Sequence, residues 1–246
     1  MSRRSTPSDA IFAVLGFLFI LPIHAPQDIA ATHPHPLKDL STGLRFVFEN
    51  KIILATITLD LFAVLLAGAL ALLPIFAKEI LHVDAVGLGW LRAAPSLGAV
   101  IMAFVLAHRP PLKQAGHAML LAVAGFGAAT IVFGLSRNYA LSFLALALTG
   151  ACDNVSVVVR HTLVQLLTPD AMRGRVSAVN NIFIGSSNEV GAFESGVTAA
   201  LFGPILSVVG GGIGTILVVL ATAWKWPQVR TIGPLQSSEK LPSTAD

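Results

Sequence analysis

Five ionisable side chains interrupt long apolar stretches of this sequence, and they are the residues best placed to do chemistry. Asp60, Arg92 and Asp153 each interrupt one stretch, and Glu189 and Glu194 share another. A charge at the centre of a bilayer costs roughly 2.5–3.5 kcal/mol on insertion scales, so each requires a partner, a cavity or a function. Burial favours a neutral carboxyl group and a nearby cation favours a charged one, a balance that allows proton loading and release.

A helix over residues 176–201 would gather its small and polar residues on one side. With 100° of rotation per residue, one set falls within about 40° of a single line. That set is Asn180, Ser187, Gly191, Glu194 and Thr198. Asn188 lies beside this stripe and Glu189 points away from it. We therefore expect the stripe to line a polar cavity, with Glu194 as its carboxylate.

A second polar stripe follows residues 149–160 and consists of Thr149, Asp153, Ser156 and Arg160. Asp153 and Arg160 are about two helical turns apart, too far for a direct bond within one helix. Each is therefore expected to find partners on other helices. The full set of candidates for a substrate or proton pathway is Asp60, Arg92, Asp153, Asn154, Asn180, Ser187, Asn188, Glu189 and Glu194.

The elements that must position these residues are apolar segments of transmembrane length. Hydrophobic residues make up 54% of the chain and charged residues 12%, about half the charged share of a soluble domain. A helix needs roughly 20 residues to cross the hydrocarbon core, whereas a barrel strand needs about ten with alternating polarity. Six stretches have helical length: Ile52–Ala77, Val86–Ala107, Ala115–Leu135, Tyr139–Val159, Val176–Leu201 and Phe202–Trp224. The sequence predicts an all-α membrane protein with six transmembrane helices.

Lys and Arg residues gather on one side of these six segments. That side holds Lys38, Arg45, Lys51, Arg109, Lys113, Arg160, Arg173, Arg175, Lys225, Arg230 and Lys240, whereas the other holds Lys78 and Arg137. The positive-inside rule therefore predicts a multi-pass protein of the cell membrane, inner or plasma, with both ends of the six-helix unit in the cytoplasm. The same topology explains the basic pI near 9.4, and the scattered charges argue against a nucleic-acid partner.

The flanking regions divide the rest of the chain. Residues 1–9 are a tail, and residues 10–23 are apolar but only 14 long. This short segment fits a signal-peptide core, a re-entrant segment or the remnant of a preceding transmembrane helix, and we favour the remnant. Residues 24–51 are expected to form a cytoplasmic linker with an amphipathic lead-in helix. The six-helix domain then covers residues 52–224, and residues 225–246 form a cytoplasmic tail.

Small residues and missing motifs narrow the function further. Gly210 and Gly214 have the G-x-x-x-G spacing that allows close helix contact, and Gly191 with Ser195 has a looser version. The sequence has no H-E-x-x-H or G-x-S-x-G motif. We predict no enzyme, no metal and no cofactor, with energy supplied by a gradient or a separate subunit. Since the third and sixth segments carry no Asp, Glu, Lys or Arg, they are expected to face lipid while the other four surround the cavity.

Three segments resemble the major facilitator superfamily, and most of all its enterobactin-exporter branch. They are Thr58-Leu59-Asp60-Leu61-Phe62-Ala63, Gly89-Trp90-Leu91-Arg92-Ala93-Ala94-Pro95, and Thr168-Pro169-Asp170-Ala171-Met172-Arg173-Gly174-Arg175-Val176. The likeness covers about residues 37–232 and corresponds to the second half of the usual twelve-helix carrier. It implies that the six helices form two three-helix inverted repeats, one half of a major facilitator fold.

The resemblance also assigns roles to the loops on the basic side. Arg109 matches the first arginine of the superfamily's gating loop, but His108 stands where the family has aspartate, which puts the gating role of that loop in doubt. The stretch from Arg160 to Arg175, with Asp170 and Arg173, is interpreted as a cytoplasmic connector that couples the helices mechanically.

The function predicted from residues and resemblance together is proton-coupled efflux, as an antiporter, of a small organic molecule such as a siderophore or a drug-like compound. The expected partners are the lipid bilayer, the substrate, protons, and either an N-terminal six-helix half or a second copy of this chain. Three explanations fit a chain that supplies only one six-helix half: a truncated reading frame, a half-transporter that dimerises, and a split gene. We favour truncation. The alternative function is a membrane assembly or regulatory partner without transport, or an inactive fragment.

Overall fold

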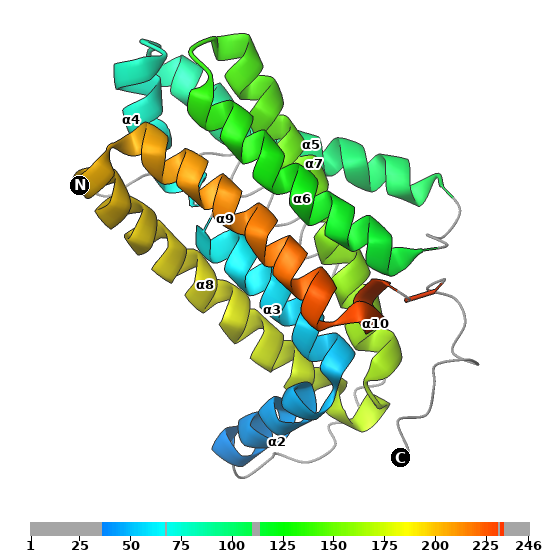
Figure 1. The fold of residues 1–246 in the computed structure, drawn as a ribbon. Helices are drawn as coiled ribbons and strands as arrows, with labels where there is room; N and C mark the ends of the chain where they lie inside the picture. The colour runs from blue at the N-terminus through cyan, green and yellow to red at the C-terminus, as the bar shows by residue number, and fades with distance from the viewer. Residues whose placement is uncertain (1–35, 67, 110–113, 231, 234–246) are drawn as a thin grey trace, which may run out of the picture. The chain divides into compact units, whose positions relative to one another are not determined.

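The computed structural model describes residues 36–66, 68–109, 114–230 and 232–233, and the regular elements of these residues are all helices. The predicted helix remnant at residues 10–23 and most of the C-terminal tail lie outside the described residues. The long helices are α2 (Pro36–Glu49), α3 (Lys51–Leu66), α5 (Ala85–Ala107), α6 (Ala115–Leu135), α7 (Tyr139–Leu167), α8 (Arg173–Phe202) and α9 (Pro204–Lys225) (Figure 1). A short helix, α10 (Pro227–Arg230), follows α9.

Five segments are long and apolar enough to cross a membrane, which confirms an all-helical membrane fold. They are Lys51–Ile80, α5, α6, α7 and α9. Helix α8 has 30 residues, about 45 Å at 1.5 Å per residue, but its Asn, Ser and Glu residues make it less apolar than the other five. The sixth span therefore remains a prediction.

The first span is not one continuous helix, contrary to the prediction for residues 52–77. After α3 ends at Leu66, the chain forms a 3₁₀ turn (η1, Ala69–Leu72), a short α-helical turn (α4, Leu73–Ile75) and a π-helical turn (η2, Phe76–Ile80). Pro74 has no backbone N–H to donate to the residue four positions earlier, which disfavours one continuous helix here, and it stands in the first turn of α4, where that donor is not needed. The break brings Gly68 against the Ser195 side chain and the Gly191 carbonyl oxygen, where a β-carbon would collide.

Helix packing follows the pattern expected of two related triplets. Helix α5 packs on α7, α6 packs on both α7 and α9, and α3 packs on both α8 and α9. Exchanging α3, α5 and α6 with α7, α8 and α9 in order maps the contact between α6 and α9 onto itself and converts each of the other four contacts into another of the four. Six successive spans would alternate in direction and make the two triplets run in opposite senses, so the inverted-repeat arrangement stays a prediction together with the sixth span.

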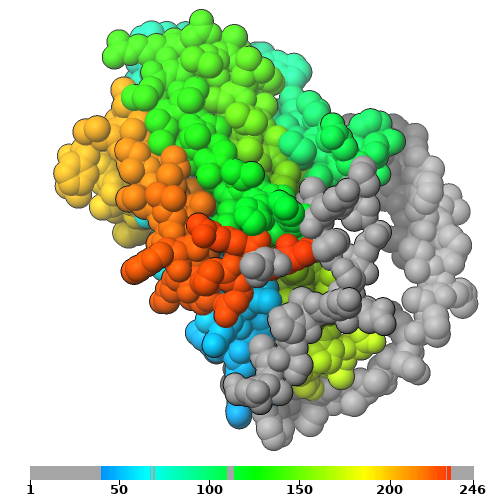
Figure 2. Space-filling view, turned by 45° about the vertical axis from the view of Figure 1, so that its right-hand side comes forward, coloured from blue at the N-terminus to red at the C-terminus, as the bar shows by residue number. Residues whose placement is uncertain are grey.

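Helices α6 and α9 correspond to the third and sixth predicted segments, which carry no Asp, Glu, Lys or Arg. They are not the most exposed of the described helices. Half of the transmembrane window of α6 is buried, against 17% for α5. Helices α6 and α9 lie against each other, and the face drawn in Figure 2 shows their surfaces side by side. The prediction that α6 and α9 face lipid stays a prediction, although small residues of α6 let α7 and α9 approach it closely.

Glycines mark three close helix contacts. A β-carbon at Gly98 would overlap the carbonyl of Ala147, and one at Gly150 would overlap that of Pro95, so α5 and α7 touch through their backbones. In the contact between α6 and α9, a β-carbon at Gly212 would lie 2.8 Å from the Gly127 carbonyl oxygen.

The predicted G-x-x-x-G contact is only partly right. Gly210 faces open space, and the close approach is made by Gly212, two residues further along α9. The looser Gly191–Ser195 motif does form a close contact, because a β-carbon at Gly191 would lie 2.8 Å from the Leu65 carbonyl oxygen on α3.

Helix α2 packs across one end of the bundle. Its buried Val47 joins an apolar cluster with Ile53 of α3, Val164 of α7 and Val176 of α8. Gly43 lies against the backbone of Arg175, so α2 also approaches the start of α8. The cluster ties the beginnings of α3 and α8 to the end of α7, the same end of the bundle at which the buried charges lie.

Candidate functional site

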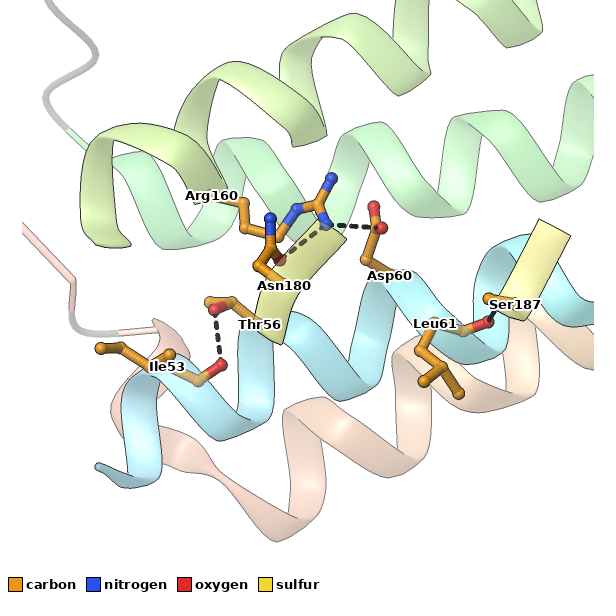
Figure 3. A network of polar contacts seen from close by, with 7 residues as sticks. All are labelled: Ile53, Thr56, Asp60, Leu61, Arg160, Asn180 and Ser187. Atoms are coloured by element: carbon orange, nitrogen blue, oxygen red, sulfur yellow. Dashed lines mark hydrogen bonds and ion pairs between the residues drawn. The ribbon is translucent and has the colours of Figure 1, made fainter. Parts of the chain in front are cut away.

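A buried ion pair joins two helices that are far apart in the sequence. The Arg160 Nη1 of α7 lies 2.9 Å from the Asp60 Oδ2 of α3, and the exposed fractions of the two side chains are 2% and 7%. The same Nη1 donates a hydrogen bond to the Asn180 Oδ1 of α8 at 3.3 Å. Figure 3 shows the guanidinium between these two partners. One arginine therefore connects α3, α7 and α8.

The placement of Arg160 corrects its predicted role as part of a cytoplasmic connector. Helix α7 does not end at Val159 but continues to Leu167, so Arg160 lies inside the helix and faces the core. Its Nε atom is buried and has no hydrogen-bond partner among the described residues. A fully buried cation needs a countercharge, and Asp60 supplies it.

Asp60 and Asp153 line the same small cavity. Ser156 and Cys152 of α7 also line it, together with apolar residues of α3 and α6. Its volume is about 10 Å³, near the minimum for one water molecule. The Ser156 Oγ is buried within reach of the Asp60 carboxyl group, although no hydrogen bond of standard geometry joins them.

A larger, mostly apolar cavity lies on the other side of Asp153. Its volume is about 100 Å³, and it shares Asp153 and Phe126 with the small cavity. The rest of its lining is Leu70, Pro95, Thr130, Phe133, Leu146, Thr149 and Gly150. Asp153 is thus the polar residue between a water-sized polar cavity and an apolar one.

Most of the polar stripe on α8 is a packing surface, although the sequence predicted that it lines a cavity. Asn180 binds Arg160, Gly191 lies against α3, and the Ser187 hydroxyl donates to the Leu61 carbonyl oxygen at 2.6 Å. Figure 3 shows the contact between Ser187 and Leu61. Small side chains in a membrane protein let helix backbones approach closely, and here they seat α8 on α3.

The end of the stripe, in contrast, borders an open groove. Glu194 and Thr198 line a cavity of about 370 Å³ with Ser207, Phe202, Leu66, Leu206, Gly210 and Gly211. The Thr198 and Ser207 hydroxyls lie 2.7 Å apart and bond each other. Glu194 is therefore the one carboxylate of the stripe in contact with a cavity, at the boundary of α8 and α9 rather than beside Asp60.

The remaining candidates do not join the buried cluster. Arg92, Asn188 and Glu189 are exposed on the surfaces of α5 and α8. Asn154 is half-buried, and its Oδ1 has no hydrogen-bond partner among the described residues. Among the described residues, no group of three His, Cys, Asp or Glu side chains could hold a metal ion.

The residues assigned to loop gating lie apart from one another. Arg109 is exposed after the end of α5. Asp170 and Arg173 form an exposed ion pair of 2.9 Å before α8, and Arg175 is half-buried in the first turn of that helix. The sequence interpretation also missed Cys152 as a cavity residue, because thiols in apolar helices give no signal of their own.

The Ser187 hydrogen bond gives a direct test of the contact between α8 and α3. We expect Ser187→Ala to lower the free energy of unfolding by about 1 kcal/mol, because the Leu61 carbonyl loses its side-chain donor. Ser186→Ala is the matched control, since Ser186 is exposed. Thermal unfolding of both variants in one detergent measures the difference. Equal melting temperatures would show that the Ser187 bond contributes nothing to packing.

These features define a class of protein. An all-helical bundle with five candidate membrane spans is consistent with the membrane fold of the major facilitator superfamily. The family model described as transmembrane secretion effector matches residues 8–244, and the chain belongs to this family of the superfamily. The family indicates a membrane transporter rather than an enzyme.

Relatives of known name agree with this class. The chain is 30% identical over 184 residues to the enterobactin exporter EntS of Shigella flexneri, covering 75% of this chain and 43% of the relative. It is 30% identical over 186 residues to the enterobactin exporter EntS of Citrobacter koseri, covering 76% of this chain and 44% of the relative. The chain thus spans less than half the length of the curated relatives it matches.

Proposed function

We propose that this chain is the C-terminal half of a carrier that exports a small organic molecule in exchange for protons. The observation that carries this proposal is the exposure of Arg92 on α5 and of Asn188 and Glu189 on α8. Charged and amide side chains in a membrane-embedded helix are costly when they face lipid. They require a second polar surface, and the two halves of a major facilitator carrier enclose their substrate between such surfaces.

The partner that completes the cavity is an N-terminal six-helix half or a second copy of this chain. Either would cover α5, which packs on α7 and leaves most of its surface exposed. In this proposal both ends of the six-helix unit face the cytoplasm, as the distribution of Lys and Arg requires under the positive-inside rule. Alternating access then comes from rocking of the two halves around the enclosed site.

The proposed substrate class is a siderophore or a similar organic compound of moderate size. The named relatives are enterobactin exporters. Coupling to protons is supported by carboxylates at two places in the helices, Asp60 with Asp153 in the core and Glu194 beside the groove. A carboxylate that is alternately buried and hydrated can bind a proton from one side and release it on the other.

Efflux from proteoliposomes that contain both halves tests the function. We expect a proton gradient to drive release of radiolabelled enterobactin, the compound in the names of the relatives. We also expect Asp153→Asn and Glu194→Gln to slow it by about a hundredfold, the lower end of what a lost proton-transfer group costs. Glu79→Gln is the matched control, because Glu79 is exposed in η2 outside both cavities.

Two results would contradict the proposal. Wild-type rates in both the Asp153 and the Glu194 variants would remove these residues from proton coupling. Complete absence of flux from correctly inserted wild-type halves, with any offered substrate, would instead favour a non-transporting assembly or regulatory partner.

A further inference from the structure

The buried cluster contains more acidic groups than basic ones. Asp60 and Asp153 both line the 10 Å³ cavity, and Arg160 pairs with Asp60. None of the described residues that line this cavity carries a positive charge. With both carboxylates ionised and Arg160 charged, the cluster has one uncompensated negative charge. Asp60 is buried and Asp153 is half-buried. Because a charge removed from water is far more costly than a neutral carboxyl group, one bound proton would neutralise the cluster.

Neighbouring helices supply few other groups that could take that proton. From α8 the neutral Asn180 faces Arg160, and from α6 the cavity is lined by Val123 and Phe126, which do not titrate. On α7, the Cys152 thiol shares the cavity, and His161 acts electrostatically on Asp60 from an exposed position. These two residues are the alternatives that an experiment has to separate from the carboxyl groups.

The two carboxyl groups have unequal surroundings. Asp60 is held by the guanidinium at 2.9 Å, whereas no ion pair to Asp153 is seen among the described residues. Asp153 also borders the 100 Å³ cavity, which gives it a second open side. The Ser156 hydroxyl lies beside Asp60 and makes no hydrogen bond of standard geometry. A water molecule in the small cavity would therefore have three polar neighbours, within the usual range for a buried water.

We propose that Asp60, Asp153 and Ser156 form a single proton-binding site around one bridging water, with Arg160 as the fixed countercharge and Asp153 as the residue that carries the proton. This inference rests on the proposed function and names its proton site within this half. When Asp153 releases its proton to water, its carboxylate becomes the second anion of the cluster. The Arg160 Nε, which has no partner among the described residues, is the donor available to that anion.

Infrared difference spectroscopy of the full 246-residue chain in lipid nanodiscs tests the site. Exposed carboxyl groups are already ionised above about pH 6, so a carboxylic acid C=O band that disappears between neutral and alkaline pH reports a buried proton. We expect one such band in the wild type and its loss in Asp153→Asn. Cys152→Ser, His161→Gln and Glu79→Gln are the controls and should keep it, since Glu79 is exposed in η2.

A second variant keeps the test decisive if Asp153→Asn fails to fold. Ser156→Ala leaves both carboxyl groups in place, and we expect it to shift the frequency of the band without removing it, because the bridging water loses one partner. A band that is unchanged in both Asp153→Asn and Ser156→Ala would overturn the proposal. So would a band that disappears in Cys152→Ser, His161→Gln or Glu79→Gln while surviving in Asp153→Asn.

The outcome for the site is separate from the outcome for the function. A band assigned to Asp153 in a carrier whose efflux ignores the proton gradient would keep the site and reject proton coupling. Proton-driven efflux together with an unchanged band in Asp153→Asn would keep the function and reject this site.

Discussion

Arg160→Met is expected to lower the free energy of unfolding by about 3–5 kcal/mol, the cost of breaking a buried ion pair by removing one partner. Methionine fills similar space but cannot compensate Asp60, which is 5% exposed. The Asn180 Oδ1 also loses the hydrogen bond that Arg160 donates to it. The measurement is chemical or thermal unfolding of the chain in a fixed detergent.

The chain supplies a matched control for this substitution. Arg173 and Asp170 form an ion pair of the same 2.9 Å length, but their side chains are 52% and 87% exposed. We expect Arg173→Met to cost at most about 1 kcal/mol, as is usual for solvent-exposed pairs. Equal losses for Arg160→Met and Arg173→Met would show that burial of the first pair does not determine its contribution.

The double variant Arg160→Met with Asp60→Asn separates pairing from packing. Removing both charges leaves no uncompensated ion, so we expect the double variant to recover much of the stability lost in Arg160→Met. If the two single losses simply add, the ion pair carries no coupling energy and the cluster must be held by packing alone.

Gly98→Ala and Gly150→Ala are expected to cost about 3 kcal/mol or more, at or beyond the upper end for overpacking. In both cases the new β-carbon would overlap a backbone carbonyl of the facing helix, Ala147 for Gly98 and Pro95 for Gly150. A backbone carbonyl cannot rotate away as a flexible side chain can, so α5 must move off α7. We expect a lower yield of folded protein and a lower melting temperature.

Gly89→Ala is the control on the same helix. Gly89 has no heavy atom within 4 Å of an added β-carbon, so alanine there should raise stability by up to about 1 kcal/mol through helix propensity. If Gly98→Ala is as stable as Gly89→Ala, the close contact between α5 and α7 is not present in the folded protein.

The amino-acid sequence alone determined that this protein lies in the hydrocarbon core of a membrane, and it also indicated the class of the fold. Apolar runs of about 20 residues match the thickness of the hydrocarbon core. The length of a run can be read from the sequence without knowing which helices pack against it. The resemblance carried by the segments around Asp60, Arg92 and Asp170 pointed to the superfamily that the family comparison confirms. The expectation that Arg160 finds its partners on other helices also followed from spacing, because Arg160 and Asp153 are about two turns apart and cannot bond directly.

Only the tertiary structure decided which residues meet. Helical period identifies the face that a residue occupies but not the helix that covers that face. For this reason Asn180 and Ser187 belong to a packing surface, Gly212 rather than Gly210 makes the close contact, and Asp60 pairs with a residue 100 positions away. Such pairings depend on how all the helices fill space together, and no local pattern of one helix contains that information.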